Sequence, residues 1–103
     1  MKRNVDWLVP DWPAPPPVHA VCTTRAGGCS ASPYESLNLG DHVGDQPRHV
    51  ASNRAVLEQA TGARAVFLSQ VHGTHVEYLT AETQNGTVAD AAQTTKVGVA
   101  CTV

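Results

Sequence analysis

The sequence predicts an α+β domain in which a mixed, largely antiparallel sheet packs against helices. Two observations support this fold class. Residues 46–61 carry a helical signal, whereas 18–24, 66–80 and 97–103 are rich in β-branched or other apolar residues without a helical period. With 103 residues and 42% hydrophobic side chains, the chain is long enough for one apolar core.

The helix predicted over residues 46–61 has signals at both ends. Asp45 can cap its N-terminus, Pro47 suits its first turn, and Gly62 ends it. Its expected buried face consists of three apolar residues at helical spacing, Val50, Leu57 and Ala60.

Residues 1–17 are predicted to form a proline-rich lead-in. Five of the chain's seven prolines lie between Pro10 and Pro17, and proline has a fixed φ and no N–H group. Three apolar side chains are expected to pack it, namely Trp7, Leu8 and Trp12. Residues 18–103 are then the N-terminal part of a single domain, with 18–24 as its first core strand.

The remainder of the chain alternates between loops and strands. Residues 26–44 carry Gly, Pro, Ser and Asn throughout, which predicts a long loop of the kind that is usually functional or disordered. Residues 66–80 predict one strand, or two short strands broken at Gly73. The Asn85-Gly86 pair is typical of a turn that favours a hairpin.

Composition and charge exclude several classes of function. Seven basic and nine acidic residues give a net charge of -2, and no Lys/Arg cluster is present that suits nucleic acid. No stretch approaches the roughly 20 apolar residues of a membrane helix, and Asp6, Asp11 and the prolines interrupt any signal peptide. We therefore expect a soluble, cytoplasmic protein that binds neither nucleic acid nor membrane. We also expect it to be a monomer.

The three cysteines are expected to be free thiols of a reducing compartment, because they are widely spaced and form no CxxC pair. They are Cys22, Cys29 and Cys101. Apolar neighbours predict that Cys101 is an inert buried thiol and not a metal ligand.

His72 is the first candidate for chemistry, because it follows an apolar segment and precedes Gly73, where a ligand can approach the backbone closely. On these residues alone, a half-buried histidine with a structural hydrogen bond is the simpler interpretation. His75 is expected on the opposite face of an extended strand, so the two are not expected to share a metal. The other three histidines are predicted to be structural or surface residues, and they are His19, His42 and His49.

Arg25 and Asn38 are candidate binding residues. Arg25 stands before Ala26-Gly27-Gly28, where a guanidinium and backbone N–H groups can hold an anion such as phosphate, although on these residues alone an ordinary turn with a solvent-facing arginine is the preferred interpretation. Asn38 can aim its amide into a cleft or simply close a turn.

Five motifs, in order and spacing, resemble the YfiH-like (laccase-domain) family. They are Thr24-Arg25-Ala26-Gly27-Gly28, Pro33-Tyr34-Glu35-Ser36-Leu37-Asn38-Leu39-Gly40, His42-Val43-Gly44-Asp45, Asn53-Arg54 and Gln70-Val71-His72-Gly73, and Asp90-Ala91 adds a further match. The resemblance covers about residues 5 to 103 and implies that 18–103 is part of one YfiH-like catalytic domain.

The resemblance implies a zinc enzyme, formerly described as a polyphenol oxidase, that cleaves purine nucleosides with phosphate and deaminates adenosine. His72 matches the family's first metal-binding histidine and is the predicted catalytic and metal residue. Arg25 and Asn38 match positions that line the active site and are the predicted substrate-binding residues. The expected partners are a purine nucleoside and phosphate.

The family's other two ligands, a cysteine and a histidine in later motifs, are absent from these 103 residues. Since catalytic zinc normally has three protein ligands, this stretch is expected to be inactive alone, and the apolar run at 97–103 suggests truncation. Two alternatives remain open. One is a copper-dependent, laccase-like oxidase of phenols, and the other is a non-catalytic module that binds a nucleotide or anion at Arg25.

Overall fold

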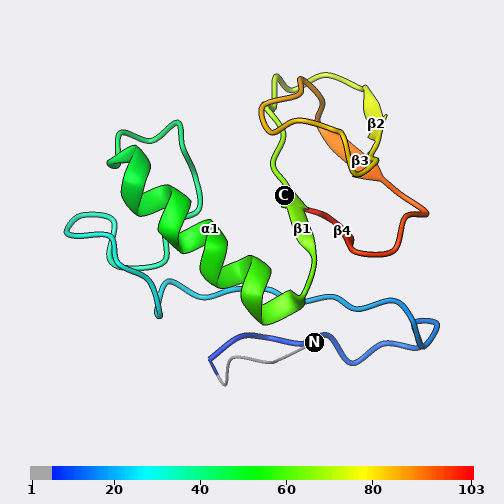
Figure 1. The fold of residues 1–103 in the computed structure, drawn as a ribbon, viewed down its shortest axis with the longest axis horizontal. Coiled ribbons are helices and arrows are strands. Elements are labelled where there is room, and N and C mark those ends of the chain that lie inside the picture. The colour runs from blue at the N-terminus through cyan, green and yellow to red at the C-terminus, as the bar shows by residue number, and fades with distance from the viewer. Residues whose placement is uncertain (1–5) are drawn as a thin grey trace. The chain divides into compact units, whose positions relative to one another are not determined.

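The computed structural model describes residues 6–103, which divide into two compact units after Thr61. Among the described residues, helix α1 lies in the first unit and strands β1 to β4 lie in the second, as labelled in Figure 1. Within the described residues, no helix is long and apolar enough to cross a membrane. The predicted boundary between a lead-in at 1–17 and a domain at 18–103 does not correspond to this division, and it stays a prediction.

Helix α1 (Pro47–Thr61) organises the first unit and confirms the prediction for 46–61. Val50 and Leu57 are buried as predicted, whereas Ala60 is half-buried. The helix also buries Asn53, whose exposed fraction is 0%. Gly62 follows the helix at a φ of +69°, a left-handed conformation that glycine adopts without steric cost.

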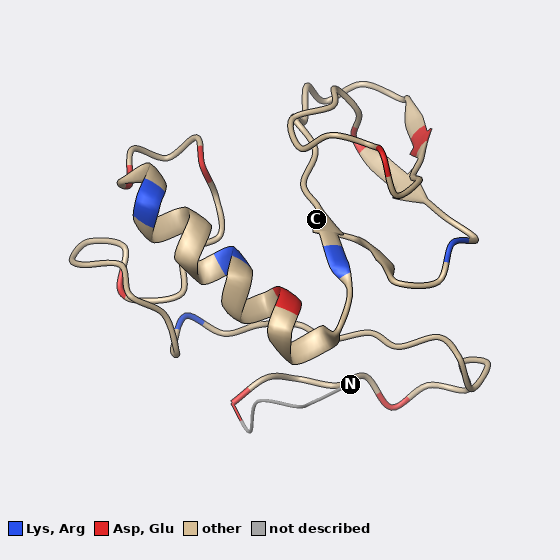
Figure 2. Ribbon diagram, in the orientation of Figure 1, with Lys and Arg blue, Asp and Glu red and all other residues tan. Residues whose placement is uncertain are grey.

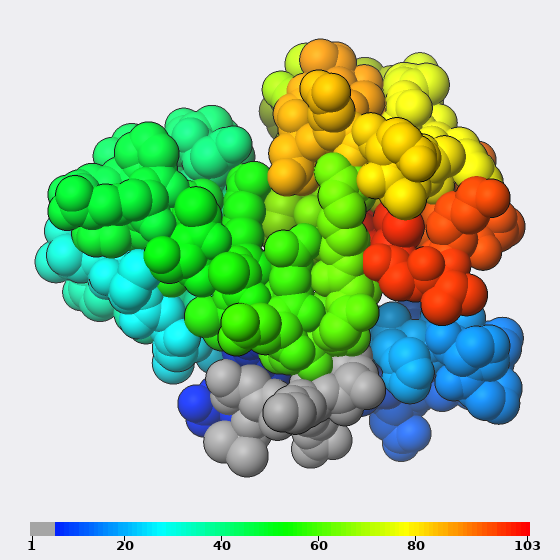
Figure 3. Space-filling view, viewed as in Figure 1, coloured from blue at the N-terminus to red at the C-terminus, as the bar shows by residue number. Residues whose placement is uncertain are grey.

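The loop that precedes the helix packs directly on it, as the cyan and green surfaces of Figure 3 show. Leu37, in the middle of this loop, is 5% exposed. The long segment 26–44 is therefore an ordered part of the first unit, although it contains neither helix nor strand.

The strand predicted over 18–24 is wrong. Only Cys22 pairs, in an isolated antiparallel bridge with Leu8 that has N···O distances of 2.9 and 2.8 Å. A strand needs a continuous partner, and the prolines that follow Leu8 have no N–H group to extend the ladder. Of the three side chains expected to pack the lead-in, Trp7 is 4% exposed, but Leu8 and Trp12 are more than half exposed.

The second unit contains two pairs of short strands: β1 (Arg64–Val66) with β4 (Val99–Cys101), and β2 (Val76–Tyr78) with β3 (Ala91–Gln93). Its buried apolar residues are Ala65, Val66, Leu79 and Ala89. The expectation of one or two strands within 66–80 is confirmed only in part, because β2 is the one strand inside this range and β1 ends at Val66. Between them only Ser69 pairs, in an isolated bridge with Val88.

The α+β class is confirmed, but both strand pairs are parallel, in contrast to the largely antiparallel sheet expected. Asn85-Gly86 does form a turn, with Gly86 at a φ of +88°. It lies in the connection between β2 and β3, which pair in parallel, so the predicted hairpin is not formed. Its polar groups bind Phe67 instead, since the Phe67 N–H donates to Asn85 Oδ1 and the Gly86 N–H to the Phe67 carbonyl oxygen. Parallel pairing results because the chain crosses over before each return strand.

All three cysteines are free, as predicted, and all are exposed. The prediction that Cys101 is buried is therefore wrong. A strand side chain projects from a face of the sheet, and the described residues leave the Cys101 side chain largely uncovered on its face. Partial burial nevertheless raises the pKa of the Cys101 thiol.

Candidate functional site

His72 lies in the turn between β1 and β2, and its backbone is unusual. Its φ is +60°, and it is the only residue other than glycine with a positive φ among residues 6–103. This conformation costs a residue with a side chain about 1–3 kcal/mol and persists only where surrounding contacts impose it. The side chain is exposed, so the ring is not packed among apolar side chains.

Asp90 supplies those contacts from the residue just before β3. Its Oδ1 atom accepts hydrogen bonds from the N–H groups of Val71, at 3.0 Å, and His72, at 2.7 Å. Its Oδ2 atom accepts one from Gly73 at 2.6 Å. One carboxylate thus holds three consecutive backbone N–H groups across a separation of 17 to 19 residues.

The same contacts keep Asp90 ionised. Desolvation acts to raise the pKa of its carboxyl, but the N–H groups of Gly73, His72 and Val71 outweigh it and hold the pKa below its ordinary value. An ionised oxygen is the strongest acceptor available to a backbone N–H group.

Gly73 fits closely against this carboxylate. A Cβ atom at position 73 would lie 3.2 Å from Asp90 Oδ2, which the Gly73 N–H already binds. The glycine therefore permits the close approach of the Asp90 carboxylate, whereas the approach of a ligand to this position stays a prediction.

His75 and Glu77 form a second polar pair in the same unit. The Nε2 atom of His75 is 2.8 Å from Oε1 of Glu77, and the His75 carbonyl oxygen accepts a hydrogen bond from the Asp90 N–H. His75 is therefore an exposed imidazole that already has a carboxylate partner. His72 differs, because no described residue forms a hydrogen bond with its ring.

Arg25 begins a tightly bonded loop in the first unit. Its Nε atom donates to the Glu35 carbonyl oxygen at 2.9 Å, and its own carbonyl oxygen accepts from Ser36 and Leu37. The N–H groups of Gly27 and Gly28, which the sequence offered as anion ligands, both donate to Ser36 Oγ at 3.1 Å. The guanidinium is exposed, but the backbone groups expected beside it are already satisfied.

Asn38 belongs to a polar network that ties the loop to α1. Its amide nitrogen donates to the Gly40 carbonyl oxygen and to Asp45 Oδ2, both at 3.1 Å. Asn53 is the centre of the network, since it accepts from the Cys29 N–H and donates to Ser30 Oγ and to the Asn38 carbonyl oxygen. The Ser30 hydroxyl donates in turn to Asp45 Oδ2 at 2.6 Å.

The described residues do not by themselves make a zinc site. Among residues 6–103, no three His, Cys, Asp or Glu side chains lie close enough together to hold a metal ion. His72 offers an exposed imidazole, which is one ligand of the three that a catalytic zinc site usually takes from the protein.

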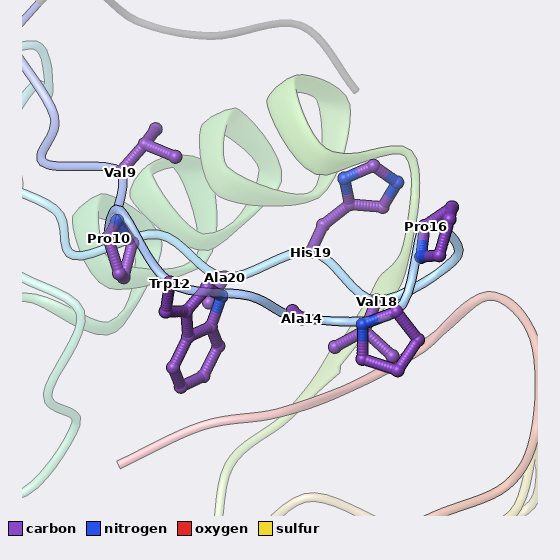
Figure 4. Close-up of a pocket in the computed structure, with 9 residues that line it drawn as sticks. Val9, Pro10, Trp12, Ala14, Pro16, Val18, His19 and Ala20 are labelled. Carbon is purple, nitrogen blue, oxygen red and sulfur yellow. The ribbon is translucent and has the colours of Figure 1, made fainter.

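A shallow hollow of about 220 Å³ lies along the lead-in, beside Trp12 and Val18 (Figure 4). Its only ionisable side chain is His19. The charged residues of the described chain are dispersed, and the basic ones form no continuous run in Figure 2. Neither feature competes with the His72 turn as a candidate site.

Arg25 and Asn38 lie in the first unit and His72 in the second, so their convergence on one cleft stays a prediction. Asp90 was noted in the sequence only as part of a family match, and its three hydrogen bonds to the His72 turn were missed. Ser36 and Asn53 were likewise quoted in motifs without a role. The only signal in the sequence for these three polar residues was that each belongs to a motif shared with the family.

Known proteins are similar to this chain along most of its length. The model of a family described as multi-copper polyphenol oxidoreductase laccase matches residues 19–103. The chain therefore belongs to this laccase-domain family, as its YfiH-like motifs implied.

Curated relatives include a purine nucleoside phosphorylase of Pseudomonas aeruginosa, which is 48% identical over 97 residues, covering 94% of this chain and 39% of the relative. The purine nucleoside phosphorylase YfiH of Escherichia coli (strain K12) is 46% identical over 98 residues, covering 93% and 40%. The chain thus spans about two fifths of the length of these relatives.

Solved structures also match. The Neisseria meningitidis protein NMB0706 has a TM-score of 0.80 and 43% identity, over 91% of this chain and 39% of that one. YlmD from Geobacillus stearothermophilus has a TM-score of 0.80 and 30% identity, over 96% and 41%. The fold of this chain is therefore a portion of the fold of these proteins.

Proposed function

We propose that this chain is part of a zinc-dependent purine nucleoside phosphorylase that also deaminates adenosine. The observation that carries the proposal is the 48% and 46% identity, over more than nine tenths of the chain, to proteins named purine nucleoside phosphorylase. The proposed substrates are a purine nucleoside and phosphate, and a cytoplasmic, monomeric protein is part of the same proposal.

His72 is the proposed catalytic and metal-binding residue. Its ring is exposed and has no hydrogen-bond partner among the described residues, and its backbone is held in a strained turn. A neutral imidazole with a free nitrogen lone pair is a good zinc ligand. The described residues supply one such ligand, and the resemblance to the family implies a cysteine and a histidine of later motifs as the other two.

Arg25 and Asn38 are the proposed substrate-binding residues. The Arg25 guanidinium uses only Nε within the loop, which leaves its other two nitrogens to face an anion such as phosphate. The Asn38 amide nitrogen is fully used, but its Oδ1 atom accepts only from the Gly40 N–H and has a second lone pair. Its contribution is therefore as an acceptor, or through the shape of the loop.

The full-length protein, incubated with adenosine or inosine and inorganic phosphate, tests this function. We expect ribose 1-phosphate with free base, and inosine from adenosine. His72→Ala should remove most of the product formation and leave only a slow residual rate, whereas His75→Ala should retain most of it, because His75 is also an exposed histidine but has a carboxylate partner of its own. Equal activity of His72→Ala and the parent would overturn the role of His72.

The copper-dependent phenol oxidase is the second candidate, and the family's description favours it. Metal analysis of the purified full-length protein separates the two. Zinc together with phosphorolysis supports the proposal. Copper together with phenol oxidation, and no cleavage of nucleosides, would replace it with the oxidase.

The anion-binding module is less well supported by the structure, because Ser36 already occupies the N–H groups of Gly27 and Gly28. Calorimetry with phosphate in the absence of metal checks this alternative. Binding that Arg25→Ala removes, in a protein without any nucleoside turnover, would favour the module over the enzyme.

A further inference from the structure

We propose that Asp90 is the positioning residue of this site, whose carboxylate holds the 71–73 turn and thereby presents the His72 imidazole to solvent. The inference rests on the proposed function in one respect, namely that His72 is the residue the site uses. The geometry of the turn itself is independent of that function.

The side-chain hydrogen bonds of Asp90 are all made to the backbone of residues 71–73. Two oxygens accept three consecutive N–H groups at 2.6 to 3.0 Å, and the shortest of these bonds are those of His72 and Gly73. The Asp90 N–H also donates to the His75 carbonyl oxygen at 3.2 Å. Asp90 thus binds the backbone on both sides of the turn.

A carboxylate is the side chain that this arrangement requires. Three N–H donors face the two oxygens of Asp90, so both oxygens must act as hydrogen-bond acceptors toward the turn. In Asp90→Asn, one oxygen is replaced by an NH2 group that would face an N–H donor, and at least one hydrogen bond is lost. Asp90→Ala would remove all three.

The left-handed backbone at position 72 points to a role beyond turning the chain. The other positive-φ residues described are five glycines, which adopt this conformation at no steric cost. Here the chain places a histidine in that conformation and a carboxylate to impose it. Without the carboxylate, the backbone of His72 would relax to a negative φ, and the direction of its Cα–Cβ bond would change.

NMR spectroscopy of the full-length protein tests the turn directly. A positive φ brings the amide hydrogen close to its own Hα, so the parent should show a strong intraresidue NOE at His72 and slow amide exchange at 71–73. We expect Asp90→Asn to weaken this NOE and to speed exchange at these three amides about tenfold or more, because at least one hydrogen bond to an ionised oxygen is lost. Glu82→Gln, an exposed acidic residue of the same unit, is the matched control and should change neither.

Nucleoside cleavage tests whether the turn acts through His72. Asp90→Asn should lower kcat about 10–100-fold in the parent background. In the His72→Ala background the same substitution should change the residual rate by less than about twofold, because coupled residues are non-additive. A purely structural Asp90 would instead lower the unfolding midpoint and the activity equally in both backgrounds.

The outcomes separate the inference from the proposed function. An unchanged NOE and unchanged exchange in Asp90→Asn would overturn the inference, and so would an altered turn with full activity. An altered turn in a protein whose parent cleaves no nucleoside would support the geometric assignment while removing the proposed phosphorylase function.

Discussion

Gly28 shows how a single position can have no room for any side chain. A Cβ atom there would lie 2.2 Å from the Ser36 carbonyl oxygen, 2.5 Å from Asn53 Oδ1 and 2.6 Å from the Leu37 Cα atom. Two of these atoms are backbone, and the third belongs to the fully buried Asn53, so none can withdraw cheaply. The loop approaches α1 this closely only because residue 28 is a glycine.

Gly28→Ala should therefore destabilise the protein by about 3 kcal/mol, the upper part of the usual range for overpacking. Gly40→Ala is the matched control in the same loop. Its Cβ would have ordinary contacts of 3.6 Å and more, at a backbone conformation that alanine accepts. Urea unfolding measures both, and similar stabilities of the two variants would contradict the packing described for Gly28.

Asn53 explains why the loop is ordered without secondary structure. Its side chain satisfies the Cys29 N–H, the Ser30 hydroxyl and the Asn38 carbonyl oxygen, which together replace the ladder bonds of a strand. The polarity of Asn53 in the sequence gave no indication that it is buried, because asparagine is usually exposed.

At the scale of an element, α1 was predictable because its signals are local. Asp45, Pro47 and Gly62 stand within one turn of its ends, and Val50 and Leu57 repeat at helical spacing. The strands were predictable only in part. Residues 18–24 have the composition of a strand but find a partner for Cys22 alone, and pairing depends on what another segment offers.

The end of α1 provides a prediction for an element. Gly62 has a φ of +69°, and no atom lies within 4 Å of a Cβ placed there, so the cost of a substitution is that of the backbone alone. Gly62→Ala should destabilise the protein by about 1 kcal/mol, and Gly62→Asn by less, because asparagine tolerates the left-handed region. Thermal unfolding monitored by circular dichroism compares them, and an alanine variant as stable as the parent would rule out this helix end.

At the scale of the whole molecule, acid stability should depend on Asp45. Its side chain is 4% exposed. The hydrogen bond from Ser30, against the opposing effect of desolvation, and further bonds from Asn38 and Gln46 hold the pKa of this carboxyl below its ordinary value of 3.8. A depressed folded pKa means that the ionised carboxylate stabilises the fold above pH 3.8, and that this stability is lost as pH falls through the folded pKa.

Asp45→Asn should thus be less stable than the parent at pH 7, and the difference should shrink below about pH 4. Urea midpoints at pH 7, 5, 4 and 3 measure the difference between the two proteins. Asp11→Asn makes the same charge change at an exposed position and should show little difference at any pH. If the difference in urea midpoint between Asp45→Asn and the parent stays constant from pH 7 to pH 3, the stabilising role of the ionised Asp45 carboxylate is refuted.

Short-range patterns in the sequence determined the α+β class, the helix and its end at Gly62. They do so because a helix and its caps depend on neighbours within a few residues. The motifs of the YfiH-like resemblance, in turn, gave His72, Arg25 and Asn38 their roles as candidate residues. Only the tertiary structure decided the parallel direction of the strand pairs, the Asn53 network and the grip of Asp90 on the His72 turn. Each of these features joins groups that are 12 or more residues apart in the sequence. Spacing along the sequence does not indicate which distant backbone N–H group a polar side chain will bind.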